Sequence, residues 1–122
     1  MKTLARLGFP SSQRLVARIE HQPKRQSTVT VSDSDSKKED KFSFSGIAAL
    51  TVTYHDACTE EMVRAYDQLV ELTDSDWLCE TKKKLERTRS SAVGLRHFRL
   101  YVDDGPCFDF ICEGYEHAQT RG

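Results

Sequence analysis

A chain of 122 residues has room for one domain at most, and its 38% hydrophobic and 30% charged residues are typical of a globular protein. No apolar run approaches the roughly 18 residues of a membrane-spanning helix, so the sequence predicts no membrane span. The net charge of −1 conceals an asymmetry, because residues 1–30 hold six basic residues against one acidic residue and the remainder carries −6. Nucleic-acid affinity rests largely on cationic contacts, so this acidic body argues against nucleic-acid binding.

Residues 1–30 predict a mitochondrial transit peptide, because such peptides are basic, poor in acidic residues and amphipathic as helices. Leu15 and Ile19 are four residues apart on one helical face, and Arg14 and Arg18 share another. The segment lacks the uninterrupted apolar stretch of a secretory signal. We therefore expect import into the mitochondrial matrix and cleavage between about residues 20 and 30. The alternative is a disordered basic arm whose periodicity is accidental.

Residues 31–45 predict a flexible linker, because Ser, Asp and Lys dominate this segment and leave little to bury. A small domain of residues 46–122 follows. Leu50, Val52 and Tyr54 alternate with polar residues, which predicts a half-buried strand.

The segment 59–73 predicts an amphipathic helix. Thr59 can cap its first turn, and Tyr66 and Leu69 belong to an apolar stripe at helical spacing. Trp77 follows the expected end of this helix and should pack on the same core. The next segment, residues 80–91, is charged on every face and predicts a solvent-exposed helix or loop.

Residues 96–112 predict a β-hairpin. Two alternating runs flank Asp103, Asp104, Gly105 and Pro106, which are residues that favour a tight turn. Each strand places its large apolar residues on one face, and a hairpin requires other elements to cover such a face. We expect one core that contains Phe98, Leu100, Phe108, Phe110, Trp77, Tyr66 and Leu69. The fold class predicted for the chain is α+β, an amphipathic helix with an antiparallel hairpin, preceded by a disordered N-terminus.

A zinc site is the first chemical hypothesis to weigh. Cys107, Cys112 and His117 have four residues in each gap, and His55 and Cys58 could supply further ligands. However, an offset of five residues along a strand places Cys107 and Cys112 on opposite faces, whereas zinc requires ligands that converge on it. The sequence therefore predicts small core residues at these positions, and no metal ligand.

Other catalytic patterns are equally weak. Asp103 and Asp104 could be read as paired carboxylates, but adjacent Asp residues before Gly-Pro are typical of a turn. No cysteine or histidine lies in a recognisable nucleophile motif. We predict no cofactor and no catalytic residue. Reduced thiols are expected in the mitochondrial matrix at all four cysteines, which are Cys58, Cys79, Cys107 and Cys112.

Three features in chain order resemble a known family: AYDQLVEL on the predicted helix, Trp77 shortly after it, and RHFRLYVDDGPCFDFICEGY. Together they resemble the N-terminal part of the mitochondrial acyl-CoA thioesterases of the thioesterase superfamily member four and five type. The resemblance covers roughly residues 60–115 and implies an incomplete hot-dog fold. Catalysis in that family uses a His-Gly-Gly turn and an acid in the helix after it, and this chain contains no His-Gly-Gly sequence. The resemblance therefore assigns no catalytic role to any residue here.

Two functional hypotheses follow from these observations. The first is a truncated isoform or gene fragment related to enzymes that hydrolyse fatty acyl-CoA, without turnover of its own. If turnover did occur, Asp103, Asp104 and Asp109 would be the first residues to mutate. The alternative is a small mitochondrial protein-binding module that uses an exposed sheet face. Both hypotheses predict a protein partner or self-association through the hairpin, and the first leaves acyl-CoA as a ligand.

Overall fold

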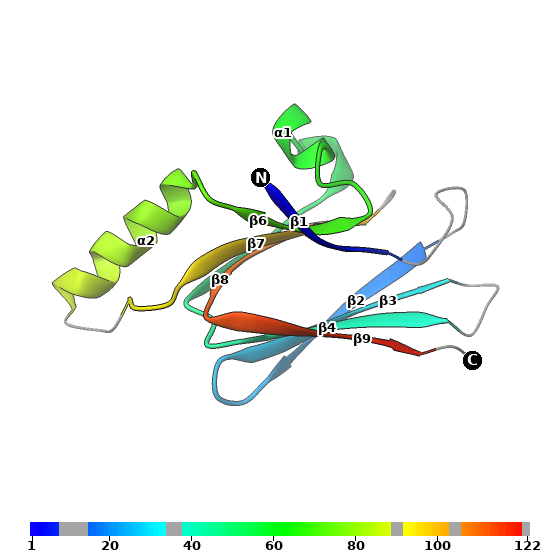
Figure 1. The fold of residues 1–122 in the computed structure, drawn as a ribbon, viewed down its shortest axis with the longest axis horizontal. Helices are drawn as coiled ribbons and strands as arrows, with labels where there is room; N and C mark the ends of the chain where they lie inside the picture. Colours follow the sequence, from blue (N-terminus) through cyan, green and yellow to red (C-terminus); the bar gives the residue numbers. More distant parts are fainter. Residues whose placement is uncertain (8–14, 34–37, 89–91, 103–105, 121–122) are drawn as a thin grey trace.

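The computed structural model describes residues 1–7, 15–33, 38–88, 92–102 and 106–120, which form two antiparallel sheets and a few short helices (Figure 1). Sheet A contains, in spatial order, β1 (Lys2–Arg6), β6 (Gln68–Leu72), β7 (Arg96–Tyr101), β8 (Cys107–Cys112) and β5 (Ala49–Thr53). Sheet B contains β2 (Leu15–Gln22), β3 (Gln26–Asp33), β4 (Glu39–Ser45) and β9 (Gly114–Thr120). The helices are η1 (His55–Ala57), α1 (Glu60–Val63) and α2 (Asp76–Arg87).

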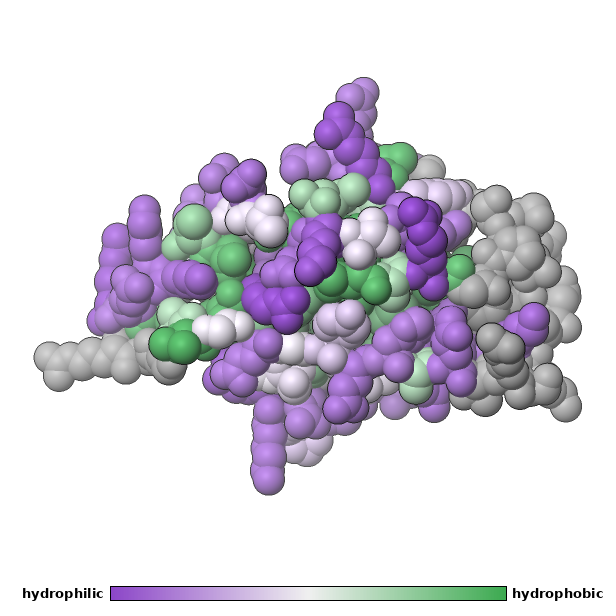
Figure 2. Space-filling model, viewed as in Figure 1, coloured by the Kyte–Doolittle hydropathy of each residue, from purple (hydrophilic) through white to green (hydrophobic). Residues whose placement is uncertain are grey.

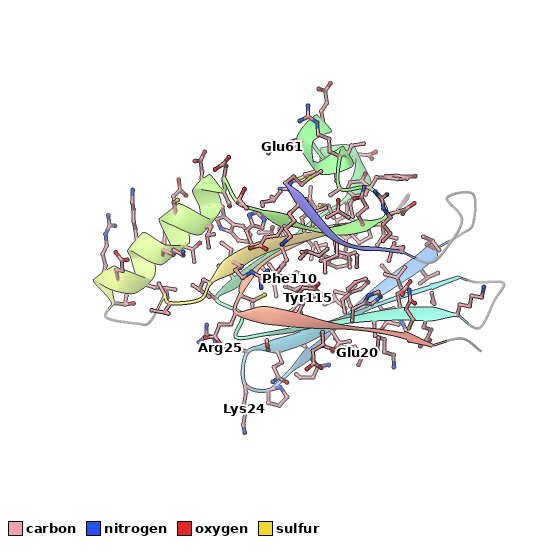
Figure 3. The ribbon with its side chains drawn as sticks, in the orientation of Figure 1. Glu20, Lys24, Arg25, Glu61, Phe110 and Tyr115 are labelled. Carbon is pink, nitrogen blue, oxygen red and sulfur yellow. The ribbon has the colours of Figure 1, made fainter. Side chains whose placement is uncertain are left out.

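The inner faces of the two sheets pack against each other and form the main hydrophobic core. In β4 the buried residues alternate with more exposed ones, as β geometry allows, and they are Asp40, Phe42 and Phe44. β7 and β8 are buried on both faces. Phe44 stacks on Phe110 of β8, with ring centroids 3.9 Å apart. Figure 3 shows Phe110 and Tyr115 pointing into the space between the sheets. The buried members of this core are Leu7, Val29, Val31, Phe42, Phe44, Leu69, Phe98, Leu100, Val102, Phe108, Phe110 and Cys112.

Two strand pairs form one long ribbon that bends from sheet B into sheet A. β4 pairs with β9 in sheet B, and β5 pairs with β8 in sheet A. At the bend, the Glu113 N–H donates to the Ser45 carbonyl at 3.0 Å, and the Ala48 N–H donates to the Ile111 carbonyl at 2.8 Å. The hydrogen bonding therefore continues around the corner and joins the two sheets.

Gly46 lies at this corner with φ of +64°, in the left-handed region. We expect Gly46→Ala to lower the free energy of unfolding by about 1 to 2 kcal/mol, because an L residue is disfavoured there. An added Cβ would also lie 2.5 Å from the Glu113 side chain, which is exposed and can move aside. Urea denaturation measures the loss. Gly114→Ala is the matched control, since its added Cβ meets open space; an equal loss in both variants would contradict this account.

The hairpin prediction is confirmed. β7 and β8 pair antiparallel, with Phe98 opposite Phe110 and Leu100 opposite Phe108. These four side chains and Leu69 lie in the main core, as predicted. The strand expected around residues 50–54 is also present, as β5.

Two members of the predicted core lie elsewhere, on the outer face of sheet A. Tyr66 packs on a second cluster beneath α1, and Trp77 contacts His97 from the first turn of α2. The buried members of the second cluster are Ala65, Val70, Tyr101 and Cys107.

The amphipathic helix predicted for residues 59–73 is wrong beyond its first turn. Thr59 does cap a helix, since its hydroxyl accepts the Met62 N–H at 3.2 Å, but α1 ends at Val63. Asp67 then adopts φ of +53°, which no α-helix tolerates, and Gln68–Leu72 forms β6. Pairing with β7 explains the difference, because it buries Leu69 on the inner face and Val70 on the outer face. The charged segment was predicted correctly in part, because α2 is a helix without buried residues.

The N-terminal half differs most from its prediction. The linker expected at residues 31–45 contains the end of β3 and all of β4, and the helical periodicity of the first 30 residues corresponds to β1 and β2. Alternate burial on one sheet face is the physical reason, since Val29, Val31, Phe42 and Phe44 alternate with polar residues. The chain is therefore mostly antiparallel sheet with few helices, which corrects the α+β prediction.

The outer faces of the two sheets are covered differently. Both α-helices lie on the outer side of sheet A in Figure 1, whereas no helix in the described ranges covers the outer side of sheet B. The apolar hairpin face that we expected to be open to a partner is packed on sheet B of the same chain. Of the helices that the structure describes, none combines the length and the apolar character needed to cross a membrane.

Candidate functional site

The outer face of sheet A carries a cluster of buried polar side chains. β7 contributes His97 and Arg99, and β8 contributes Asp109. The register of the hairpin places Arg99 directly opposite Asp109, with His97 on the diagonal. Ser75 reaches the same cluster from the residue that caps α2. The fold thus gathers four residues from three separate parts of the chain.

Hydrogen bonds connect these residues in series. The Asp109 Oδ1 atom lies 2.6 Å from His97 Nε2 and accepts from Arg99 Nε at 2.7 Å. On the other side of the imidazole, His97 Nδ1 lies 2.6 Å from the Ser75 hydroxyl, which also accepts the Leu78 N–H at 3.0 Å. An ionised carboxylate only accepts hydrogen bonds, so His97 Nε2–H is the donor in its hydrogen bond to Asp109.

The cluster is withdrawn from solvent. The exposed fractions are 9% for Ser75, 4% for His97 and 2% for Asp109. Arg99 is 8% exposed, and its Nη1 atom has no hydrogen-bond partner among the described residues. Opposite charges on Arg99 and Asp109 make burial possible, because an unpaired charge in this position would be very unfavourable.

A serine, a histidine and an aspartate in series invite comparison with a hydrolase triad. In such a triad the serine bonds Nε2 and the aspartate bonds Nδ1 of the histidine; here the two nitrogens have the opposite partners. The Ser75 hydroxyl is also engaged as the cap of α2, and the Trp77 ring lies edge-on to His97 at 5.2 Å. This geometry holds the start of α2 on sheet A and leaves no free nucleophile in the cluster. The cluster of Ser75, His97, Arg99 and Asp109 therefore has a structural role, and we call it the latch.

The cysteines do not form a second site. Cys107 packs in the cluster beneath α1, and Cys112 lies in the main core between the sheets. The prediction that these two thiols occupy opposite faces of one strand is therefore confirmed. No group of three potential metal ligands occurs in the part of the chain that the structure describes.

Burial changes the acidity of both thiols. Burial raises the pKa of Cys107 far above its ordinary value, with a further increase from the nearby Asp109 charge. Burial also raises the pKa of Cys112 to about 12. Thiolates are the reactive form, so both thiols should be inert at neutral pH in the folded protein.

Alkylation tests this expectation. With iodoacetamide at neutral pH, we expect the exposed Cys79 to react rapidly and Cys107 and Cys112 to react only after denaturant is added. Mass spectrometry of the intact and digested protein counts and locates the adducts. Modification of Cys107 at the rate of Cys79 in the native state would show that the outer face of sheet A is open to solvent.

The outer face of sheet B is a different kind of surface, on which polar and charged side chains predominate. One row across its strands is Glu20, Thr28, Ser43 and Glu116, and the next is Arg18, Thr30, Lys41 and Ala118. A hollow of about 390 Å³ opens near the β2–β3 turn. The residues that line it are Gln22, Gln26, Ser27, Thr28, Ser43, Phe44, Ser45 and Glu116.

Two views show the character of this surface. Figure 3 places Glu20 on the outer side of sheet B, with Lys24 and Arg25 at the β2–β3 turn. In Figure 2 the lower surface, which sheet B forms, is mostly hydrophilic, and hydrophobic residues show mainly between the two sheets. Small hydroxyl side chains at the centre of the face leave it open to close approach by another molecule.

Comparison with known proteins adds no relative. No family model, curated protein or solved structure matches this chain. The resemblance to acyl-CoA thioesterases therefore stays a prediction that rests on the three sequence motifs alone.

The candidate site residues that were predicted from the sequence do not form one site in the structure. Asp103 and Asp104 lie outside the described residues. Asp109 belongs to the buried cluster, where it binds His97 and Arg99 and no solvent-facing group. His117 Nε2 lies 2.8 Å from Asp40 Oδ1 on the inner side of sheet B, and His117 forms no metal-ligand group with the cysteines among the described residues. Sequence reasoning missed Ser75 and His97 as partners, because 22 residues separate them and no local motif marks either.

Proposed function

We propose that this chain is a non-catalytic binding module that docks a folded protein partner on the outer face of sheet B. The observation that carries the proposal is the contrast between the two sheets, because both α-helices lie on the outer side of sheet A and no helix in the described ranges lies on the outer side of sheet B. The β-sandwich beneath supplies a rigid support, with aromatic residues stacked across the core. The buried latch offers no accessible nucleophile, which disfavours an enzyme.

The charges on the face define the kind of partner. Arg18 and Lys41 lie in one row, and Glu20 and Glu116 lie in the neighbouring row. Rows on one face of a sheet are two residues apart, a separation of about 7 Å. A complementary partner presents acidic groups to the first row and basic or amide groups to the second, and this arrangement also sets its orientation.

A photo-crosslinking amino acid at Ser43 of the full chain tests this proposal in the native cell. We expect a discrete crosslinked protein from Ser43 and none from Lys83, an exposed position on α2 that serves as the matched control. Thr28→Arg should then weaken binding of the purified partner by at least about tenfold, because its bulk blocks the centre of the face. Identical crosslinks from both positions, or binding unchanged by Thr28→Arg, would contradict the proposal.

Thioesterase activity is the competing function, and an assay of thiol release separates the two. The full chain is expected to release no CoA above background from short- or long-chain acyl-CoA, since hydrolysis needs an activated nucleophile or water and oxyanion donors. Saturable CoA release by the full chain that disappears in Asp109→Asn would show that the chain is an enzyme and would contradict the proposal of a non-catalytic binding module.

Mitochondrial import is the proposed localisation, supported by the charge of +5 on the first 30 residues. Cleavage between about residues 20 and 30 would remove β1 from sheet A and most or all of β2 from sheet B. We therefore propose import without removal of these strands. A fluorescent fusion of the full chain that stays in the cytosol would exclude import, and a shortened imported product would exclude retention of the strands.

A further inference from the structure

The free edge of β2 is the longest regular strand edge in the described part of the chain. β1 and β5 have five residues each, and the pairing of β1 shifts register between Thr3 and Ala5. β9 has seven residues, whereas β2 has eight and pairs with β3 without interruption. Proteins usually shorten, bend or cover such an edge, because its unpaired N–H and C=O groups bind further strands.

The side chains of β2 leave this edge open on both faces. Leu15, Ala17 and Ile19 face the core but are only partly buried. On the outer face, Arg18 and Glu20 are exposed, and Val16 keeps 47% of its surface in solvent. An added strand would cover the apolar inner row and extend the polar outer row.

The charges of Arg18 and Glu20 indicate that the added strand is β2 of a second copy of this chain. Arg18 and Glu20 flank Ile19 symmetrically, so two β2 strands that pair antiparallel about Ile19 place Arg18 of each copy opposite Glu20 of the other. The same register sets Val16 opposite Gln22 and Ile19 opposite itself. Opposite charges directly across a strand pair are stabilising, whereas a register shifted by two residues along the strand loses this pairing.

We propose that two copies of this chain associate through their β2 edges in this register. Sheet B then continues across the two-fold axis as one eight-stranded sheet, and the half-buried row at Ile19 is covered by the same row of the second copy. This interface lies on β2, and the hairpin of β7 and β8 has no part in it. Arg18 and Glu20 also belong to the rows proposed to bind a partner, so the two proposals are distinguished by Ser43 and Thr28, which lie on β4 and β3 away from the β2 edge.

Charge reversal at the edge tests the proposal by sedimentation velocity of the full chain over a range of concentrations. We expect a concentration-dependent dimer, and a loss of affinity of about tenfold or more in Arg18→Glu and in Glu20→Arg, because each variant creates two like-charge pairs. The double variant Arg18→Glu/Glu20→Arg restores the ion pairs with reversed polarity and should regain dimerisation. Added salt should weaken the wild-type dimer.

Glu116→Arg on β9 is the matched control, because it reverses an exposed charge on another edge strand of the same sheet. It should leave the association unchanged. Thermal unfolding of each variant confirms that the exposed substitutions have not changed the fold. A wild-type chain that stays monomeric at its highest soluble concentration, or a double variant that remains as weak as the single variants, would overturn the proposal.

Discussion

Phe110→Ala is expected to lower the free energy of unfolding by about 3 to 5 kcal/mol, a large part of the total stability of a small domain. Phe110 is fully buried, stacks on Phe44 of the opposite sheet and lies between Phe98 of β7 and Leu50 of β5 in the sheet register. Removing its ring leaves a cavity where the two sheets meet. Urea unfolding followed by far-ultraviolet circular dichroism measures the loss.

Tyr54→Ala is the control for this variant. Tyr54 follows β5 and is 73% exposed, so its replacement should change the stability by no more than about 0.5 kcal/mol. Similar losses in the two variants would show that the core does not lie between the sheets.

Asp109→Ala is expected to have a comparable effect through a different cause. The substitution removes the acceptor of both His97 and Arg99 and leaves the Arg99 charge buried without a counter-charge. Breaking a buried pair in this way typically costs about 3 to 5 kcal/mol. Ser75→Ala should cost less, about 1 kcal/mol, because it removes the cap of α2 and one neutral hydrogen bond. Equilibrium unfolding in urea measures both variants.

Two further variants separate the charge from the packing. Asp74→Ala changes an exposed acid beside the cluster and should be nearly neutral. The double variant Asp109→Leu/Arg99→Met replaces the pair by apolar residues and should recover part of the loss, since no charge is left unpaired and only the His97 Nε2–H loses its acceptor. A double variant as unstable as Asp109→Ala would show that shape, and not charge, fixes this site.

The sequence predicts those strands in which alternating apolar residues are flanked by residues that favour a turn. β7 and β8 alternate strongly around a corner rich in turn residues, and their pairing follows from that corner. β3 and β4 have a similar alternation, but Ser, Thr, Glu and Lys occupy their outward-facing positions and Asp40 lies among the buried residues, so the composition predicted a linker. One buried face is enough to hold a strand when a second sheet packs on it. That second sheet is a tertiary feature, which local composition does not reveal.

The buried cluster was only partly accessible from sequence. The register of the hairpin alone places Arg99 opposite Asp109, so this pair could have been predicted. Ser75 joins the cluster because α1 ends early and β6 pairs with β7, which brings the start of α2 over His97. The helical spacing of Tyr66 and Leu69 predicted a helix in place of β6, so the position of Ser75 was also missed.

The ribbon that bends at Gly46 also sets when the chain can fold during its synthesis. Phe42 pairs with His117 and Leu50 pairs with Phe110, so β4 and β5 are translated long before β9 and β8. The β2–β3–β4 meander and the β7–β8 hairpin have their partners nearby in sequence, whereas the pairs β4–β9 and β5–β8 join distant segments. Contacts between distant residues make folding slow, since the loop-closure entropy is lost before those contacts form. The aromatic residues of β4 therefore stay uncovered on the ribosome until the last strands emerge, and the nascent chain is expected to need chaperone protection there.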